Sequence, residues 1–577
     1  MQKELLLGNE AIARGAKDAG CRVAVAYPGT PSTEITETIA KLPGVDSAWA
    51  PNEKVALEVA AGASIGGARA LCCMKHVGLN VAADPMFTAA YTGVNAGLVI
   101  VVADDPGMHS SQNEQDSRYY ALSAHVPMLE PSDSQEAYDF TRLAFEMSEI
   151  FDTPVLVRIT TRIAHARSQV VLNEAVQADI RDYAKNAAKY VMMPAMARAR
   201  HVMVEEHMQK LAEYAETLPA NVEIPGDNMG IVTSGIAYQY VREALPGASV
   251  FKLGMVHPLP LDRIRAFADK VDALYVVEEL EPFIENVLKA AGIRAEGKSV
   301  FPSRGELSAN LIAQKLAGTA VEHADAPRLP VRPPVMCPGC PHRAVYYLLG
   351  KLKLTATGDI GCYTLGALPP LNGIDTCLCM GASIPMALGM EKARGREFAR
   401  SLVAVIGDST FVHSGITGLI EAAYEGGTFT VLILDNATTG MTGHQNHPAT
   451  GYNIRGEAAP RIDLEVMARA AGAEHVTVVD PFNLKTLEST LRAETSREAL
   501  SVVICRRPCA LLGKTQQPPL TVQEDRCRYC KACMKLGCPA IEDAGGKVRI
   551  DANICNGCGL CTGVCAFSAI GAGGAEA

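Results

Sequence analysis

The chain has 577 residues, 48% of them apolar, which is enough for several domains with their own cores. A net charge of −10 and the lack of a basic block argue against a nucleic-acid-binding protein, and no apolar run reaches the roughly twenty residues that cross a bilayer. No signal peptide opens the chain, so we expect a cytoplasmic protein in which eighteen cysteines serve metal or redox chemistry.

The first 185 residues alternate short apolar strands with helical stretches, as in an α/β domain. Strands are predicted at 23–26, 98–102 and 154–158, and each is followed by polar residues. Ligands of doubly wound sheets bind beyond the carboxyl ends of the strands. We therefore expect a site at those ends.

A helix rich in alanine is predicted to begin at Asn52, with Glu53 in its first turn. Glu53 is either a functional buried carboxyl or a solvated residue that the helix dipole favours. Glu58 in the same helix is the rival candidate. His76 follows the next predicted strand and is either a structural residue or a catalytic one that moves protons or binds substrate.

The middle of the chain carries no predicted catalytic residue. Residues 186–224 are helical and charged and are interpreted as a connector with a solvated face. Residues 225–325 form a second α/β unit, and the prolines between 324 and 334 indicate a linker.

A third unit contains two apolar runs, 402–406 and 429–434, on either side of a helical stretch. Such a βαβ unit would bring Asp408 and Asn436, which follow the two strands, to one crevice. Mg²⁺ prefers oxygen ligands and often binds together with phosphate, and Gly407 would allow a phosphate to approach the backbone. The alternative is an ordinary βαβ unit with an Asp cap and an Asn turn.

The same unit begins with Cys337-x-x-Cys340. As zinc ligands these cysteines need a second pair, and none has regular spacing. Cys505 and Cys509 have no evident partners and are interpreted as structural.

The tail has the most specific pattern in the chain, two CxxCxxC runs that each precede a further cysteine. This pattern is typical of a module with two [4Fe–4S] clusters, in which the fourth cysteine of each run binds the other cluster. The predicted ligand sets are Cys527, Cys530, Cys533 and Cys565, and Cys538, Cys555, Cys558 and Cys561. Two departures are a longer spacing before Cys538 and Ala566 in the usual place of Pro.

The stretch from Gly407-Asp408 to Asn436 resembles the diphosphate-binding motif of thiamine diphosphate (ThDP) enzymes. The resemblance implies that Asp408, Asn436 and the carbonyl of Thr438 hold Mg²⁺, with Ser409 where Gly is frequent. Glu53 resembles the Glu that bonds the pyrimidine ring of the cofactor. The residues implied to bind ThDP are Glu53, Gly407, Asp408, Ser409, Asn436, Cys362, Met441 and Thr442.

Two further stretches resemble the 2-oxoacid:ferredoxin oxidoreductases, a ThDP family. Tyr27–Ser32 resembles a segment whose Thr lies by the substrate, and Thr30 has that position here. Asn113–Arg118 resembles a segment whose Arg contacts the substrate carboxylate, and Arg118 has that position here. In this family a Cys-Pro-x-Cys stretch lines the cofactor site, and we favour that role over zinc for Cys337 and Cys340.

The resemblance implies an α/β fold of several doubly wound ThDP-binding-type domains with a small ferredoxin-like domain at the end. The predicted divisions are a pyrimidine-type domain (1–185), the connector (186–224), a transketolase C-terminal-like domain (225–325), a diphosphate domain (326–515) and a two-[4Fe–4S] domain (516–577).

The resemblance implies that the chain is the α subunit of an enzyme that oxidatively decarboxylates a 2-oxo acid, passes single electrons through the clusters to ferredoxin, and gives the acyl group to coenzyme A. Domain order and Cys337–Arg343 resemble subunits that act on aryl 2-oxo acids such as indolepyruvate, which implies a separate β subunit and an α2β2 assembly.

Three alternatives remain at this stage: a ThDP decarboxylase without electron transfer, an enzyme for pyruvate or 2-oxoglutarate, and an electron-transfer subunit with degenerate ThDP domains. The preferred aryl group, the residues that bind coenzyme A and the direction of the reaction have no sequence signal.

Overall fold

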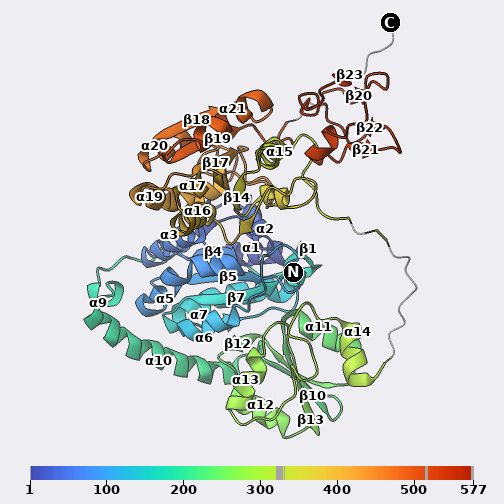
Figure 1. Ribbon diagram of the computed structural model, residues 1–577. Helices are drawn as coiled ribbons and strands as arrows, with labels where there is room; N and C mark the ends of the chain where they lie inside the picture. Colours follow the sequence, from blue (N-terminus) through green and yellow to red (C-terminus); the bar gives the residue numbers. More distant parts are fainter. Residues whose placement is uncertain (1, 320–328, 331, 514–516, 573–577) are drawn as a thin grey trace. The chain divides into compact units, whose positions relative to one another are not determined.

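The computed structural model describes residues 2–319, 329–330, 332–513 and 517–572 (Figure 1). The chain divides into two compact units, residues 1–327 and 328–577. Each is built on mixed helices and parallel sheets, which confirms the predicted α/β class.

The first unit contains a seven-stranded sheet whose strands are parallel except at one edge. Its order is β12 (Met255–His257), β6 (Met128–Leu129), β7 (Val155–Thr160), β5 (Leu98–Asp104), β4 (Ala70–Lys75), β2 (Val23–Ala26) and β3 (Asp46–Trp49). Because parallel strands end at one edge, the loops after β2, β3, β4, β5 and β7 lie together there.

The central strand β5 is buried along its whole length because helices cover both faces of this sheet. Val99 and Val101 belong to one core cluster, while Ile100 and Val102 belong to the other, as the period of two requires. The first face is covered by α1 (Gly8–Asp18), α2 (Thr33–Ile39) and α7 (Ser134–Phe151), and the second by α3 (Glu53–Ile65), α4 (His76–Val81), α5 (Ala83–Thr92) and α6 (Arg118–Ala124).

A smaller four-stranded sheet completes the first unit, in the order β13 (Ala273–Val277), β10 (Met229–Ser234), β11 (Ser249–Leu253) and β9 (Val222–Ile224). Its helices are α11 (Gly235–Ala244), α12 (Leu261–Ala268), α13 (Phe283–Ala290) and α14 (Ala309–Ile312). β12 lies within residues 225–325, which are predicted as a separate domain, yet it pairs with β6 and forms an edge strand of the large sheet.

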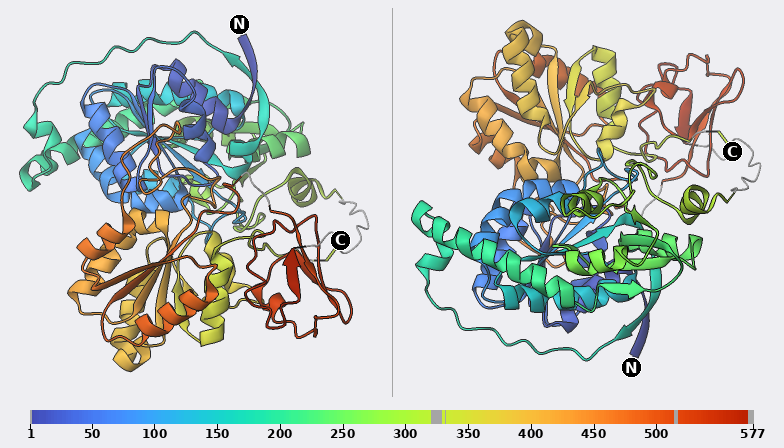
Figure 2. Two further views of the ribbon diagram at one scale, coloured as in Figure 1. Left: turned by 90° about the horizontal axis from the view of Figure 1, so that it is seen from above. Right: turned by 90° about the horizontal axis from the view of Figure 1, so that it is seen from below.

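The predicted connector contains α9 (Ala187–Tyr190) and the long helix α10 (Pro194–Thr217). Between β8 (Arg167–Leu172), which pairs with β1 (Gln2–Leu7), and α9 the chain runs as an extended arm along the first unit (Figure 2). Backbone hydrogen bonds from Val176 to Asp18 and from Arg181 to Gly67 fix this arm.

The second unit contains a six-stranded sheet that is parallel throughout. Its order is β15 (Thr376–Cys377), β14 (Thr355–Gly358), β16 (Leu402–Gly407), β17 (Thr430–Asp435), β19 (Ser501–Arg506) and β18 (His475–Val479). The covering helices are α15 (His342–Leu352), α16 (Ser383–Arg394), α19 (Ile416–Tyr424), α20 (Leu464–Ala470) and α21 (Leu484–Thr495).

A small C-terminal module follows the sheet. Two antiparallel pairs form it, β20 (Leu520–Val522) with β23 (Ile570–Ala572), and β21 (Ile541–Asp543) with β22 (Val548–Ile550). Its core is short of aliphatic side chains and includes cysteines such as Cys533 and Cys561. A module this small depends on cross-links or metal centres for its stability.

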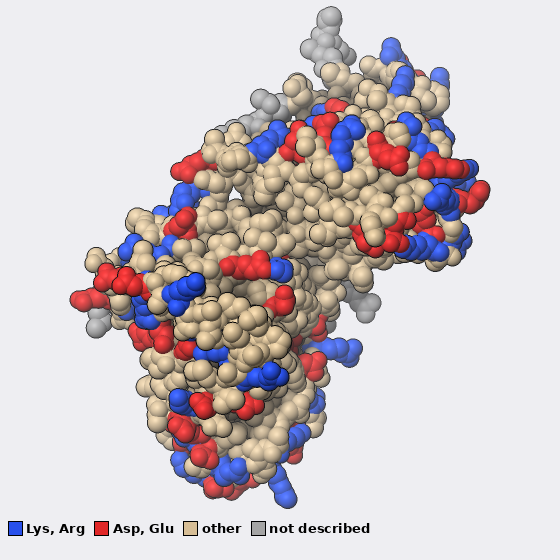
Figure 3. Space-filling view, turned by 90° about the vertical axis from the view of Figure 1, so that its left-hand side faces the viewer, with Lys and Arg blue, Asp and Glu red and all other residues tan. Residues whose placement is uncertain are grey.

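No helix in the described part of the chain is both long enough and apolar enough to cross a membrane. Acidic and basic side chains are interspersed on the face seen in Figure 3, without a large area of one sign.

Candidate active site and thiol clusters

The two oxygen ligands predicted in the second unit meet at the carboxyl ends of neighbouring strands. Asp408 follows β16 and Asn436 follows β17, and these strands pair in parallel. Both side chains are buried. One end of the Asn436 amide lies 3.1 Å from Asp408 Oδ1 and 2.8 Å from the carbonyl oxygen of Thr438.

This arrangement of three groups suits a small cation. With its nitrogen at that end, the Asn436 amide donates hydrogen bonds to Asp408 and Thr438. With its oxygen there, three oxygens face one another at separations close to the roughly 2.9 Å edge of an octahedron with Mg–O distances of about 2.0–2.1 Å. Oxygens in that arrangement repel one another unless a cation lies between them, so the donor set fits Mg²⁺.

The backbone holds Asp408 firmly. Its Oδ1 accepts a hydrogen bond of 2.9 Å from the amide of Ser409, and its Oδ2 accepts one of 2.9 Å from the amide of Ala437. His447 Nε2 lies 3.3 Å from the same Oδ2. The carboxylate is therefore oriented by both strand ends.

The residues predicted to contact ThDP in this unit occupy the loops after β14, β16 and β17. Cys362 begins a 3₁₀ turn after β14, and its sulfur would lie 3.5 Å from a Cβ placed on Gly440. The Ser409 hydroxyl accepts a 2.9 Å hydrogen bond from Thr439, and the Thr442 hydroxyl donates one of 2.5 Å to Gln445. Gly407 and the half-exposed Met441 lie in the same group of loops.

Asp359, three residues before Cys362, organises these loops. Its buried carboxylate accepts hydrogen bonds from the amides of Gly381 (2.9 Å) and Ser383 (3.1 Å), which belong to the turn before α16. Burial raises the pKa of Asp359 to about 6, against these amide hydrogen bonds, which lower it.

Four cysteines from distant stretches gather beside this sheet edge. Burial raises the pKa of the Cys340 thiol to about 12, and the nearby thiols of Cys337 and Cys509 act in the same direction. The Cys362 thiol, whose pKa burial also raises, interacts with the same two neighbours. We call Cys337, Cys340, Cys362 and Cys509 the inner thiol set. In the folded chain Cys362 and Cys509 thus lie near the CxxC pair, although the four residues come from separate loops.

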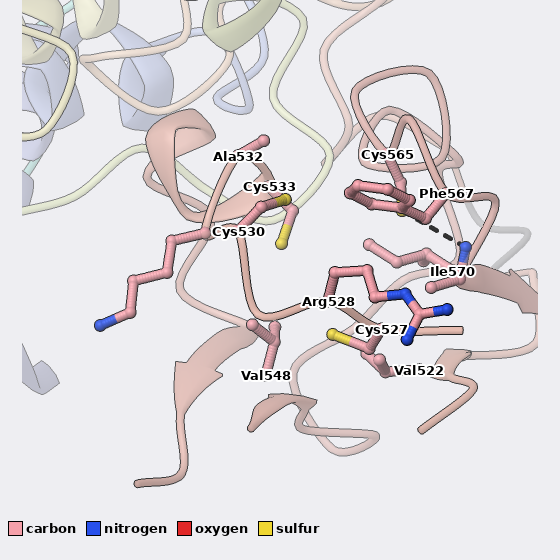
Figure 4. A pocket seen from close by; sticks show the side chains of 12 residues that line it. Val522, Cys527, Arg528, Cys530, Ala532, Cys533, Val548, Cys565, Phe567 and Ile570 are labelled. Atoms are coloured by element: carbon pink, nitrogen blue, oxygen red, sulfur yellow. Dashed lines mark hydrogen bonds between the residues drawn. The ribbon is translucent and has the colours of Figure 1, made fainter. Parts of the chain in front are cut away.

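Two further sets of four cysteines line separate cavities in the C-terminal module, and Figure 4 shows the cavity lined by Cys527, Cys530, Cys533 and Cys565. The distal set is Cys527, Cys530, Cys533 and Cys565, and the middle set is Cys538, Cys555, Cys558 and Cys561. Each set combines three thiols of one run with the fourth thiol of the other, as in the predicted ligand sets. Burial raises the pKa of Cys533, and its three partners raise it further.

Among the described residues, no group of three or more His, Cys, Asp or Glu side chains is gathered closely enough for one metal ion. A [4Fe–4S] cluster has a thiolate at each of its four irons, so its ligands surround a larger volume. The distal and middle sets fit that donor pattern.

In the first unit, Glu53 lies at the carboxyl edge of the large sheet, in the first turn of α3. It is 4% exposed, and a Cβ placed on Gly78 in α4 would lie 2.7 Å from its Oε1 and 2.8 Å from its Cγ. Glu58 is exposed and pairs with Lys54 on the surface. The solvated alternative therefore describes Glu58, and Glu53 is a buried carboxyl.

His76, Thr30 and Lys75 lie at the same edge. His76 is 1% exposed, its Nε2 lies 3.2 Å from the carbonyl oxygen of Asn113, and its Nδ1 has no hydrogen-bond partner in the described structure. Thr30 follows β2, and its carbonyl oxygen accepts from the Ser110 hydroxyl at 3.4 Å. Lys75, half-buried at the end of β4, donates to the carbonyl oxygen of Ser110 at 3.0 Å.

Arg118 does not fit its predicted contact with a substrate carboxylate. The side chain is 1% exposed, its Nε donates to Asp116 at 2.8 Å, and its Nη1 donates to Glu278 at 2.6 Å. Its Nη2 donates to Asp116 and to the carbonyl oxygens of Glu279 and Glu281. All sides of the guanidinium are occupied, so Arg118 fastens α6 to the smaller sheet.

Two family models match the chain. A domain described as "Pyruvate flavodoxin/ferredoxin oxidoreductase, thiamine diP-bdg" matches residues 14–224, and "Thiamine pyrophosphate enzyme, C-terminal TPP binding domain" matches residues 359–505. The first match contains Glu53 and the second contains Asp408 and Asn436. Both parts of the chain are thus related to ThDP-binding domains.

Relatives extend over almost the whole chain. The indolepyruvate oxidoreductase subunit IorA of Archaeoglobus fulgidus is 40% identical over 99% of this chain and 97% of its own length, and that of Pyrococcus horikoshii is 41% identical over 98% and 96%. The chain belongs to this IorA family of oxidoreductase subunits. A 2-oxoglutarate synthase subunit KorA of A. fulgidus is more distant, at 28% identity over 52% of this chain.

Membership in the IorA family makes this chain a subunit of a ThDP-dependent oxidoreductase, and it favours the oxidative interpretation over a simple decarboxylase. The KorA relative covers about half of the chain, whereas the IorA relatives also span the cysteine-rich tail.

Gly78→Ala should weaken ThDP binding at least tenfold, because the added methyl group takes the space of the Glu53 carboxyl group. Binding can be measured by calorimetry with Mg²⁺ present. Gly389→Ala in α16 is the matched control, since a Cβ there meets nothing within 4 Å. Unchanged ThDP affinity in a folded Gly78→Ala protein would contradict this role of Glu53.

Proposed function

We propose that the chain is the α subunit of an indolepyruvate:ferredoxin oxidoreductase that converts an aryl 2-oxo acid and coenzyme A into an acyl-CoA, CO₂, one proton and two electrons. Its partners in the proposal are a β subunit and ferredoxin, in an α2β2 assembly. The observation that carries the proposal is one chain of the IorA family that combines a ThDP-type oxygen site with three sets of four thiols.

In this proposal the chain's residues hold the cofactor at its two ends. Asp408, Asn436 and the Thr438 carbonyl bind Mg²⁺ and, through it, the diphosphate. The buried Glu53 carboxyl shares a proton with the aminopyrimidine ring. ThDP, when bound, supplies a nucleophilic carbon for the keto group and a sink for the electrons that the departing CO₂ leaves.

The three thiol sets are proposed as the electron route. The distal and middle sets each hold a [4Fe–4S] cluster, and the inner set, next to the oxygen site, holds a third metal–thiolate centre. Because such centres take one electron at a time, the two electrons leave the site singly. The inner set is the natural first acceptor, since its Cys509 interacts electrostatically with both Cys337 and Asp408.

Cys509→Ser should remove the inner centre and leave the two outer ones, because it changes one inner ligand and none of the others. Iron analysis and low-temperature EPR of anaerobically purified protein should show less iron than in the parent protein and one set of signals lost. Cys505→Ser, a buried thiol outside the three sets, is the control. Identical iron content in the Cys509→Ser and parent proteins would remove the inner centre from the proposal.

With Arg118 enclosed, Lys75 is the proposed cation for the substrate carboxylate. It lies at the edge shared by Glu53, His76 and Thr30, and no carboxylate of the described residues is within ion-pairing distance of its ammonium group. Burial lowers the pKa of Lys75 to about 8, against the charges of Asp105 and Glu53, which raise it. An incoming carboxylate would offset that desolvation.

Lys75→Met should raise KM for the 2-oxo acid by about 10- to 100-fold, the range for a charged hydrogen bond, with a smaller effect on kcat and on KM for coenzyme A. In the parent protein, KM for the 2-oxo acid should rise above pH 8, as the ammonium loses its proton. The nearby groups Asp105 and His76 titrate below this window, because the pKa of each is lowered from its ordinary value. Lys75→Arg should restore KM and remove the rise, and Lys270→Met, a surface change, is the control. A larger effect on coenzyme A would assign Lys75 to that substrate.

The proposed function is tested by an anaerobic assay of the chain with its β partner, Mg²⁺ and ThDP. Indolepyruvate should reduce a one-electron acceptor only when coenzyme A is present, and Glu53→Gln should abolish the reduction. Release of CO₂ and aldehyde without acceptor reduction would make the protein a decarboxylase.

A further inference from the structure

Arg343 is a buried arginine, as Arg118 is, but its hydrogen-bond acceptors are of a different kind. The side chain is 2% exposed at the start of α15, directly after the Cys337-x-x-Cys340 loop. Nη1 donates to the carbonyl oxygens of Leu536 (3.0 Å) and Gly537 (2.5 Å) in the C-terminal module. Nε donates to the Cys337 carbonyl oxygen at 3.3 Å, and Nη2 donates to that of Met336.

All of these acceptors are neutral. In the part of the chain that the structure describes, no Asp or Glu forms an ion pair with Arg343, whereas Arg118 and Arg158 each pair with two carboxylates. A buried guanidinium without an anion is costly. The molecule must therefore place negative charge near it in another form.

Cysteines of two of the three sets lie near Arg343, and they would carry that charge as thiolate ligands of metal centres. The strongest electrostatic neighbours of Arg343 are Cys538 and Cys558 of the middle set and Cys340 and Cys337 of the inner set. Arg343 also lines the cavity of the middle set, together with Pro338 and Gly339 of the CxxC loop, but not the cavity of the distal set. Asn556 Nδ2, next to Cys555, donates to the carbonyl oxygen of Pro338 at 3.0 Å and closes the same junction.

We propose that Arg343 is the counter-charge shared by the inner and middle metal–thiolate centres, and that it sets their reduction potentials relative to the distal centre. This inference rests on the proposed function, because it requires those centres to be present. A [4Fe–4S] centre becomes more negative when it gains an electron, so a fixed positive charge stabilises its reduced form. The guanidinium therefore makes these two centres easier to reduce than their thiolates alone would.

Arg343 contributes a positive charge and also hydrogen bonds that position the two loops. Three substitutions separate these two contributions. Arg343→Lys keeps the charge and loses the planar fork of donors. Arg343→Gln loses the charge and keeps an amide that can donate to the same carbonyls. Arg343→Met loses both. Arg549→Gln, an exposed residue of the module that pairs with Glu542, is the matched control.

The experiment is an EPR-monitored redox titration of the anaerobically purified full-length chain, with iron content measured for each variant. The Gln and Met variants should keep their iron and show lower potentials for the inner and middle centres, with the distal centre unchanged as an internal reference. The Lys variant should retain the parent potentials.

Two results would overturn the inference. Reduction potentials that stay the same in the Arg343→Gln variant but change in the Arg343→Lys variant would show that the hydrogen bonds matter and the charge does not. An equal shift of all three centres would show a general structural effect. If the Arg343→Met variant fails to bind iron, the comparison of the Arg343→Gln and Arg343→Lys variants still tests the role of the charge. A parent protein without iron–sulfur signals would instead refute the proposed function.

Discussion

The parallel pairing of β16 with β17 is the constraint on which the site depends. Adjacent parallel strands end at one edge, so Asp408 and Asn436, far apart in the sequence, become neighbours, and Thr438 follows in the same turn. β14 pairs on the other side of β16 and brings Asp359 and Cys362 to that edge. Cys509 follows β19, the next strand beyond β17. One sheet edge thus assembles both an oxygen site and a set of thiols.

The sequence could predict those features whose partners are close in the chain or follow a fixed spacing. The α/β class follows from apolar runs such as 402–406, and the crossed grouping of the tail cysteines follows from two regular runs. Which of two similar residues is buried cannot be predicted from their spacing in the sequence. Glu53 and Glu58 are equivalent as letters in a helix, but Glu53 packs on Gly78 while Glu58 faces solvent. The inner thiol set was missed because its members come from loops after different strands, and pairing order cannot be read from cysteine spacing.

Arg118 was misjudged for a related reason. The resemblance of Asn113–Arg118 implies a contact with a substrate carboxylate, yet the anions that Arg118 binds, Asp116 and Glu278, belong to the protein, and Glu278 follows a strand of the smaller sheet. The pair of Arg118 and Arg343 shows that burial alone does not define the role of a charge. Arg118 is neutralised by carboxylates and is structural, whereas Arg343 is surrounded by carbonyl oxygens and cysteines and has no carboxylate partner among the described residues.

Arg343 also helps to attach the C-terminal module to the sheet domain. The core of the module includes apolar residues of the sheet domain such as Ala344, Tyr347 and Leu484. Hydrogen bonds of Arg343 and Asn556 add to this connection. Both residues bond to the loops that carry thiols, at Cys337–Cys340 on one side and at Cys538 and Cys555 on the other. The same contacts that fasten the module therefore fix the separation of the inner and middle thiol sets. Under the proposed function, attachment and electron transfer would be coupled, because loosening this junction would lengthen the path between the two proposed centres.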